Sequence, residues 1–168
     1  MAPKLLFDTS GLDLERVAFD VDAIDQINPH RGAMRLLDAI VHLSDDHKQL
    51  VAYRDVRDDE FWAAGHIPGQ PIFPGVLMIE AAAQLASFSC LRRMPKASFM
   101  GFVGVDKVKF RGQVVPGDRL YVLCDEIEFR PRRCVCLTQG LVNDELVFEA
   151  VITGMPMTVR SGAAAGER

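Results

Sequence analysis

The chain has 168 residues, of which 49% are hydrophobic and 25% are charged, and its formal net charge is −4. That length fits one domain with one core, and the composition is that of an ordinary globular protein rather than a disordered or fibrous one. The modest charge gives no reason to expect a protein that coats nucleic acid, so any partner has to be identified from local features.

The first residues, Met-Ala-Pro-Lys-Leu-Leu-Phe-Asp, lack the long apolar core of a signal peptide. No run reaches the roughly 18 apolar residues that span a bilayer, so we expect a soluble, cytoplasmic protein without membrane attachment. The cysteines are too few and too unevenly spaced for a secreted disulfide framework, and we expect reduced, structural thiols. They are Cys90, Cys124, Cys134 and Cys136, and the last two fit alternate positions of one strand.

The amino-terminal third predicts little regular structure before a hairpin. Residues 12–27 mix short helical spacings with acidic residues and predict at most a short leading helix, which Asn28-Pro29 would stop. Two aliphatic runs, 36–43 and 49–56, flank a polar turn cluster at 44–48. They predict an antiparallel hairpin whose register the sequence leaves open.

A loop over residues 57–74 leads into the most distinctive segment of the chain. Residues 76–91 contain no proline or glycine, are apolar on all sides, and end at Arg92-Arg93-Met94-Pro95. This pattern predicts a buried helix of about four turns. Pro74 suits its first turn, because the missing N–H would have had no partner there.

The carboxyl half alternates apolar and polar residues. The strands expected from this period lie at 107–110, 120–124, 134–137 and 147–152, with turns at 116–118, 130–132 and 142–144. We predict an antiparallel meander, a single domain over residues 1–160, and a flexible tail over 161–168. One buried helix among five or six strands predicts an α+β fold in which a strongly curved sheet wraps the helix and a second subunit completes its cover.

The predicted helix gathers its polar side chains on one stripe. Val76, Glu80, Gln84 and Ser87 share that stripe at 100° per residue. Removing a carboxylate from water costs several kcal/mol, so Glu80 must be paired, hydrogen-bonded or held neutral, and a neutral carboxyl can act as a general acid. The alternative is that Glu80 is partly exposed, or only accepts hydrogen bonds from Gln84 and a backbone group.

His66 stands before a stiff loop. Prolines fix φ near −65° and glycines permit close backbone approach, and the loop contains Pro68, Gly69, Pro71, Pro74 and Gly75. The Gly75 N–H belongs to the unsatisfied donors of a helix's first turn and could bind a carbonyl oxygen. An oxygen binder, an imidazole and a neutral carboxyl suit β-elimination of water beside a carbonyl. Taken alone, His66 could equally be a surface or hydrogen-bonded residue.

These residues resemble a known family. The pattern His66-x-Pro68-Gly69-x-Pro71-x-x-Pro74-Gly75-Val76-Leu77-x-x-Glu80-Ala81-x-x-Gln84 is similar to that of the hot-dog-fold 3-hydroxyacyl-acyl carrier protein dehydratases of bacterial fatty-acid synthesis, in the branch with a helix glutamate. Two flanking blocks agree: Pro29-His30-Arg31 with Leu36 and Asp38, and Phe110-Arg111-x-x-Val114-Val115-Pro116-Gly117-Asp118-x-Leu120. The resemblance extends over residues 22–158.

The resemblance implies a role for each matched residue. His66 would remove the α-proton, Glu80 would protonate the departing hydroxyl, the Gly75 N–H would bind the thioester carbonyl, and Gln84 would orient Glu80. The substrate would be a 3-hydroxyacyl chain on acyl carrier protein or coenzyme A, and the product a trans-2-enoyl thioester. The resemblance also implies sites shared within a homodimer, an acyl tunnel, and no metal or redox cofactor. Members of the family often assemble further into a trimer of dimers, and the sequence leaves the choice between dimer and hexamer open.

The departures from the family pattern surround the substrate. Gly32-Ala33-Met34-Arg35 replaces bulky aromatics, Gly32 stands where an aromatic would gate the tunnel, and Ile67 replaces a phenylalanine. The candidate tunnel residues are Ile67, Phe73, Gly32 and Met34. Two other functions stay open: a hot-dog thioesterase whose carboxylate activates water, and a non-catalytic subunit that binds acyl thioesters.

The remaining candidates are weaker. His30, His42 and His47 lack the spacing of a metal site, so we interpret them as structural or surface residues. Basic residues follow the predicted helix and would attract an acidic carrier protein to a nearby site; they are Arg92, Arg93 and Lys96. The alternative for them is an ordinary solvated face.

Overall fold

The computed structural model describes residues 4–158, so the tail expected at 161–168 lies outside the described residues. The helical elements are α1 (Val21–Asp25), the 3₁₀ turn η1 (Gly32–Met34) and α2 (Gly75–Leu91). The strands are β1 (Ala39–Leu43), β2 (Gln49–Asp55), β3 (Phe99–Phe110), β4 (Arg119–Arg130), β5 (Arg133–Val142) and β6 (Glu145–Met157). The short leading helix, the hairpin and the long helix predicted from the sequence are therefore confirmed.

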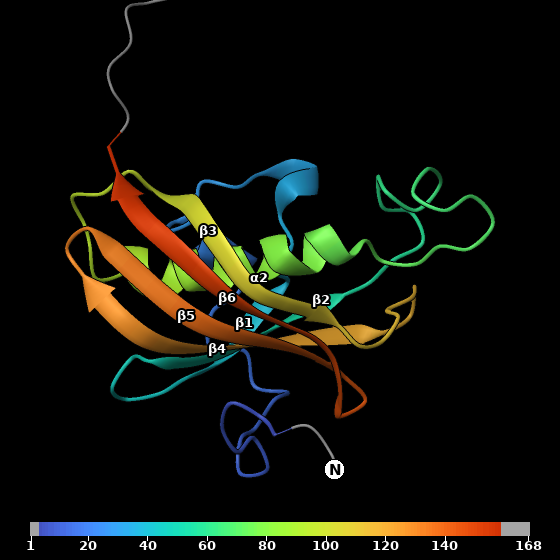
Figure 1. Cartoon of the computed structure of the whole chain (residues 1–168), viewed down its shortest axis with the longest axis horizontal. Helices are drawn as coiled ribbons and strands as arrows, with labels where there is room; N and C mark the ends of the chain where they lie inside the picture. The colour runs from blue at the N-terminus through green and yellow to red at the C-terminus, as the bar shows by residue number, and fades with distance from the viewer. Residues whose placement is uncertain (1–3, 159–168) are drawn as a thin grey trace, which may run out of the picture.

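A single curved sheet wraps α2. Six strands pair antiparallel in the order β1-β2-β4-β5-β6-β3. The sheet bends around the helix, which lies along its concave face (Figure 1). This arrangement confirms the predicted α+β fold. No helix within residues 4–158 is both long and apolar enough to cross a membrane.

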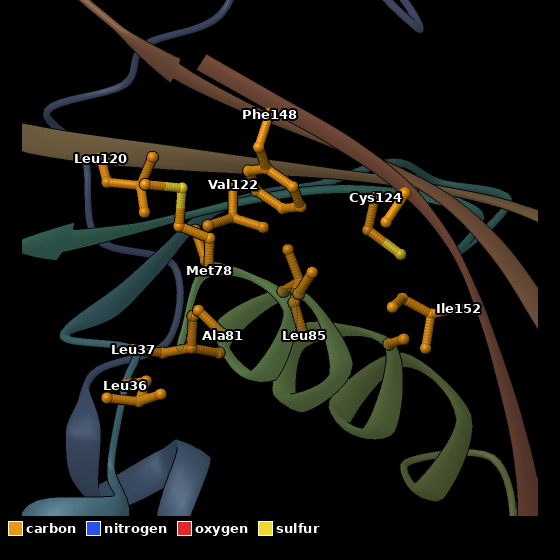
Figure 2. Packing of buried hydrophobic residues seen from close by; sticks show 14 of the residues in the cluster. Leu36, Leu37, Met78, Ala81, Leu85, Leu120, Val122, Cys124, Phe148 and Ile152 are labelled. Carbon is orange, nitrogen blue, oxygen red and sulfur yellow. The ribbon is translucent and has the colours of Figure 1, made fainter. Parts of the chain in front are cut away.

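The core lies between α2 and the sheet. Leu85 of the helix packs in the same cluster as Val122 and Phe148 of the sheet (Figure 2). Leu36 and Leu37, from the segment after η1, belong to that cluster as well. Curvature and the amino-terminal segment thus cover most of a helix that is apolar all round, whereas Val76 in its first turn stays 70% exposed.

The predicted meander is only partly correct. Strands β4, β5 and β6 are successive neighbours, but β3 does not pair with β4. It crosses to the other edge of the sheet and pairs with β6, with Phe110 opposite Phe148. Alternation of apolar residues identifies strands without saying which strands are neighbours, so this crossover was not predictable from the local pattern.

The β5–β6 hairpin shows how local sequence sets a turn. Asn143 and Asp144 have φ of 50° and 64°. Two consecutive positive φ values define a type I′ turn, which asparagine and aspartate tolerate and whose twist matches the adjoining strands. The predicted turn at 142–144 is confirmed.

The cysteines differ from the prediction of four reduced thiols. Cys90 and Cys134 form a disulfide, while Cys124 and Cys136 are free and buried. Cys134 and Cys136 do alternate on one strand, as predicted. A hydrogen bond with Cys136 and burial raise the pKa of the Cys124 thiol. The prediction was wrong for the first pair because 44 residues separate them and only the packing of α2 on β5 brings them together.

Candidate active site

Glu80 lies in the second turn of α2 and is partly enclosed. Its side chain is 25% exposed, and its Oε1 accepts a 2.9 Å hydrogen bond from Gln84 Nε2. The two residues are neighbours because positions i and i+4 share one face of a helix. Glu80 is thus the partly exposed, hydrogen-bonded carboxylate of the alternative interpretation. Whether it can act chemically depends on the groups around it.

The Gln84 amide ties Glu80 to the amino-terminal segment. Its Nε2 also donates to the Met34 carbonyl at 2.7 Å, and its Oε1 accepts from the Leu36 N–H at 3.0 Å. The backbone carbonyl of Gln84 accepts from Asn28 Nδ2 at 2.8 Å. An amide with both ends engaged has one favoured orientation, so this network fixes the position of the donor to Glu80.

His30 is the residue that sequence reasoning missed. Its Nε2 lies 3.4 Å from Glu80 Oε1, although the sequence suggested only a structural or surface histidine. Burial lowers the pKa of His30; the Glu80 charge opposes this effect and the Arg31 charge adds to it. Its Nδ1 is buried and has no hydrogen-bond partner among the described residues. The sequence did contain one sign of this contact, because His30 belongs to the block Pro29-His30-Arg31 that resembles the family pattern.

A small cavity lies beside α2 and has Glu80 in its wall. Its volume is about 50 Å³, and its walls include Ala83, Ser87 and Cys90 from the helix and Met100, Cys134 and Ile152 from the sheet. From Glu80 to Cys90 the helix rises roughly 15 Å, at about 1.5 Å per residue. The Glu80 carboxylate and the Cys90–Cys134 disulfide therefore line the same mostly apolar space.

His66 lies in a different place. It is exposed, and it lines a separate hollow of about 300 Å³ with Trp62, Val76 and Leu77. Its backbone N–H donates to the Trp62 carbonyl at 2.9 Å. The structure therefore does not bring His66 and Glu80 into one cavity within a single chain.

The loop that carries His66 is anchored by buried neighbours. Trp62 packs edge-on against Phe73, with ring centroids 5.3 Å apart, and its Nε1 donates to Glu60 at 3.1 Å. Burial raises the pKa of Glu60, but hydrogen bonds from Arg54, the Arg57 N–H and Trp62 outweigh burial and lower the pKa below its ordinary value. Glu60 thus stays ionised and fastens the loop to Arg54 of β2, at 2.8 Å.

Gly75, the first residue of α2, is needed for close packing. A Cβ built there would lie 2.8 Å from the Phe110 ring of β3, so a side chain would displace that ring. The N–H of the first helical residue has no acceptor within its own helix. With glycine at position 75, the backbone N–H is free to donate and the Phe110 ring can pack directly against the backbone.

The four candidate tunnel residues lie outside the cavity that contains Glu80 in this chain. Phe73 is 1% exposed and belongs to the core, while Ile67 and Met34 are 39% and 46% exposed. Gly32, at φ 58°, lines another hollow beside Arg54. The walls of the cavity beside Glu80 come from α2 and from β3, β5 and β6, whose position against α2 depends on long-range pairing. The tunnel residues therefore stay a prediction.

The basic residues after α2 differ in their contacts. Arg92 reaches His47 Nδ1 at 3.1 Å and lies over the Phe19 ring. Arg93 pairs with the buried Glu126 and lies 3.8 Å from the Phe129 ring centroid. Lys96 is exposed to solvent. Two of the three cations therefore have structural partners.

One buried group among residues 4–158 has the side chains of a metal site: Cys90, Glu126 and Cys134. Its donors are already engaged, because the two sulfurs form a disulfide and the carboxylate pairs with Arg93. A metal ion prefers thiolate sulfur, which a disulfide does not offer.

Comparison with known proteins identifies the family. A family model for the FabA-like domain matches residues 28–151. The chain belongs to the FabA-like family. It is 36% identical over 138 residues to the 3-hydroxyacyl-[acyl-carrier-protein] dehydratase FabZ of Lawsonia intracellularis, a match that covers 80% of this chain and 90% of that protein. The FabZ of Desulforamulus reducens is 38% identical over 132 residues, covering 78% and 92%.

A solved structure supports the same fold. The dehydratase heterocomplex ApeI:P from Xenorhabdus doucetiae contains a chain that superposes with a TM-score of 0.68 at 16% identity, covering 80% of this chain and 91% of that one. The hot-dog fold implied by the sequence resemblance is confirmed. The matched FabA-like region contains both His66 and the Glu80–Gln84 pair.

Proposed function

We propose that this protein is a (3R)-3-hydroxyacyl-acyl carrier protein dehydratase of the cytoplasm, which eliminates water to give a trans-2-enoyl thioester. The observation that carries the proposal is the Glu80 carboxylate, held by Gln84 at the mouth of a mostly apolar cavity. That arrangement suits an acid that meets an acyl chain at its third carbon. Both FabZ relatives bear this activity in their names.

Each group has one step in the elimination. The His66 imidazole takes the proton from the α-carbon, and the freed electron pair becomes the double bond. Charge that develops on the thioester oxygen is stabilised by the Gly75 N–H at the positive end of α2. Glu80 gives its proton to the hydroxyl on the third carbon, which leaves as water, while Gln84 holds the carboxyl in position.

A second copy of the chain would complete the site. His66 and Glu80 line separate cavities, which supports an arrangement in which the base of one copy reaches the acid of another. Strand β3 is the natural contact, since it forms the sheet edge and exposes Phe102, Val103, Val105 and Phe110. A long, apolar edge strand is a surface that another strand covers. We therefore propose a homodimer joined along β3.

The exposed candidate residues fit the entrance of such a shared site. Ile67 follows His66 directly, and Met34 binds Gln84 through its carbonyl, so both would lie where the two copies meet. Phe73 supports the His66 loop through Trp62. Lys96 and Arg92 remain our candidates for contact with the acidic carrier protein, with Arg93 restrained by Glu126.

The test uses Glu80→Gln and His66→Ala with a 3-hydroxyacyl thioester, reading enoyl absorbance and free thiol together. Each variant should lose about 10²- to 10⁴-fold in rate, the usual contribution of a positioned acid or base. Thermal stability should be unchanged for the exposed His66. His42→Ala, a histidine on β1, is the control and should stay active.

The same assay separates the alternatives. Free thiol without enoyl product would identify a thioesterase, and tight binding without turnover a non-catalytic subunit. Full activity in either active-site variant would overturn the mechanism.

A further inference from the structure

We propose that His30 is a positioning residue for Glu80: its neutral ring donates from Nε2 to Glu80 Oε1 and so directs the acidic proton to Oε2, the oxygen left free for the departing hydroxyl. This role rests on the proposed dehydratase function, because it takes Glu80 as the acid. It gives a function to a histidine outside the proposed His66–Glu80 pair, and the proton count of His30 does not change during the reaction.

The two oxygens of Glu80 differ in their partners. Oε1 accepts from Gln84 Nε2 at 2.9 Å and lies 3.4 Å from His30 Nε2, whereas Oε2 has no protein partner within residues 4–158. In a neutral carboxyl, the oxygen that receives the donors remains the acceptor and the other oxygen carries the O–H. Donors gathered at Oε1 therefore leave the proton of Glu80 on Oε2.

The surroundings of the His30 ring select its tautomer. A neutral imidazole has one N–H and one nitrogen without hydrogen. Nδ1 is buried and has no hydrogen-bond partner among the described residues, while Nε2 faces Glu80 Oε1. With the hydrogen on Nε2, the donor meets an acceptor. With the hydrogen on Nδ1, a buried donor would be unpaired and two lone pairs would face each other, so the Nε2–H form is favoured.

The groups around His30 also favour a neutral ring. Burial lowers the pKa of His30 most; the Glu80 charge opposes burial and the Arg31 charge adds to it. Asp25 of α1 is compensated by Arg31 and Arg35, at 3.7 and 3.5 Å. In the described part of the chain, β3, β5 and β6 add no charged side chain to the cavity that His30 and Glu80 share. A cationic ring would hold Glu80 ionised, whereas a neutral donor lets it keep the proton that it must give.

The contact is suited to a bond that tightens during the reaction. Its 3.4 Å exceeds the usual N–H···O range of about 2.7–3.2 Å, and catalytic hydrogen bonds are often long before substrate binds. As Glu80 gives its Oε2 proton to the hydroxyl, the carbon–oxygen bond breaks, water leaves, and the carboxyl becomes negative. The bond from His30 then becomes charge-assisted. His30 therefore acts mainly on kcat, since this charge is absent from the ground state.

The experiment replaces the ring by side chains that reproduce one of its nitrogens. Counted in bonds from Cβ, the glutamine Nε2 corresponds to the histidine Nε2, and the asparagine Nδ2 corresponds to Nδ1. His30→Gln should keep kcat within about threefold of wild type, whereas His30→Asn and His30→Leu should lower kcat by about 10- to 100-fold with little change in KM.

His42 on β1 is the matched control. Burial lowers the pKa of His42 as well, but the charge that acts on it belongs to Asp45 and not to Glu80. His42→Gln and His42→Asn should therefore have equal kcat values. Denaturant unfolding of every variant separates a loss of stability from a loss of rate, because a purely structural role for His30 would lower both together.

A second arm needs no turnover. Nitrogen NMR of isotope-labelled histidine should show His30 as the neutral Nε2–H tautomer at neutral pH, and Glu80→Gln should shift its signal but not that of His42. Full kcat in His30→Leu, or equal losses in His30→Gln and His30→Asn, would overturn the inference and leave the dehydratase function intact. An absence of turnover in the wild type, with the Nε2–H signal still sensitive to Glu80, would overturn the function alone.

Discussion

The regions around Glu80 and His66 are held by the fold in different ways. Glu80 rises from the core helix, is 25% exposed, and receives a hydrogen bond from an amide whose two ends are both engaged. His66 lies on an irregular loop whose backbone is anchored at Trp62, while its side chain is exposed. Under the proposed mechanism, one chain would thus position the acid fully but only present the base. This is the contrast that a site shared between two copies predicts.

The largest expected effect comes from mixing two inactive variants. If His66 acts on the Glu80 of another copy, co-expressed His66→Ala and Glu80→Gln chains should recover about a quarter of wild-type activity, because half of randomly formed dimers are mixed and one site in each is intact. Each variant alone should remain at background. Activity per mole of purified dimer is the measurement.

The same mixture of His66→Ala and Glu80→Gln chains can also show that the site is not shared between copies. Sites built within one chain would leave every mixed dimer inactive, since each chain would carry one defect. The double variant His66→Ala/Glu80→Gln mixed with wild type is the control. In a shared arrangement both sites of its mixed dimer are damaged, so half of the wild-type chains' activity should be lost.

A second prediction tests how the acid is held. Gln84→Leu should lower kcat by up to about a hundredfold through misplacement of Glu80, and should cost about 1–3 kcal/mol because Met34 and Leu36 lose their buried partner. Gln139→Leu is a matched control: its amide likewise joins two backbone groups, Leu6 N–H and Lys4 carbonyl, far from Glu80.

Denaturant unfolding and steady-state kinetics separate the two glutamines. Both variants should be destabilised to a similar extent, and only Gln84→Leu should lose turnover. Equal loss of activity in both would mean that destabilisation, not the position of Glu80, lowers the rate.

The sequence predicted the structure correctly where the conformation of a segment depends on its own residues. The apolar run before Arg92 predicted α2 to within one residue at its start, since only a helix of that length buries every side. Asn143 and Asp144 marked a tight turn because these residue types accept positive φ. The α+β arrangement followed from such local patterns, and the hot-dog fold followed from the family resemblance.

The sequence did not predict the contacts between segments that are far apart in the chain. The pairing of β3 with β6, the Cys90–Cys134 disulfide and the contact of His30 with Glu80 all depend on how the sheet closes around α2. Spacing between residues carries no information about such closure. The cavity beside Glu80 illustrates the point, because its walls come from α2 and from strands far along the chain.

A third prediction, with a smaller effect on rate, concerns Lys96, which follows the carboxyl end of α2. Lys96→Glu should slow turnover of carrier-bound substrate a few-fold at low salt, and the difference should shrink as salt screens the charge. Turnover of the coenzyme A thioester should change less. Arg93→Glu is unsuitable for this test because it would place two carboxylates together at Glu126. Unchanged carrier-bound rates at low salt would remove Lys96 from the contact.

The smallest expected effect is on the pH dependence of stability. It distinguishes His30, which lies beside Glu80, from the exposed His66. Burial lowers the pKa of His30 in the folded protein below its unfolded value near 6.5, so folding favours the neutral ring. The stability that depends on this preference is fully present above about pH 6.5 and is lost as the pH falls through the folded-state pKa, because the unfolded chain binds the proton first.

His30→Gln should therefore flatten the fall of Tm between about pH 7 and pH 5. Burial also lowers the pKa of His42, so the double variant His30→Gln/His42→Gln should flatten it further. His66→Gln, which alters an exposed ring, is the comparison. If it flattened the curve as much as His30→Gln does, the burial of the His30 ring would not be the source of the pH dependence, and the contrast between the two regions would have to rest on catalysis alone.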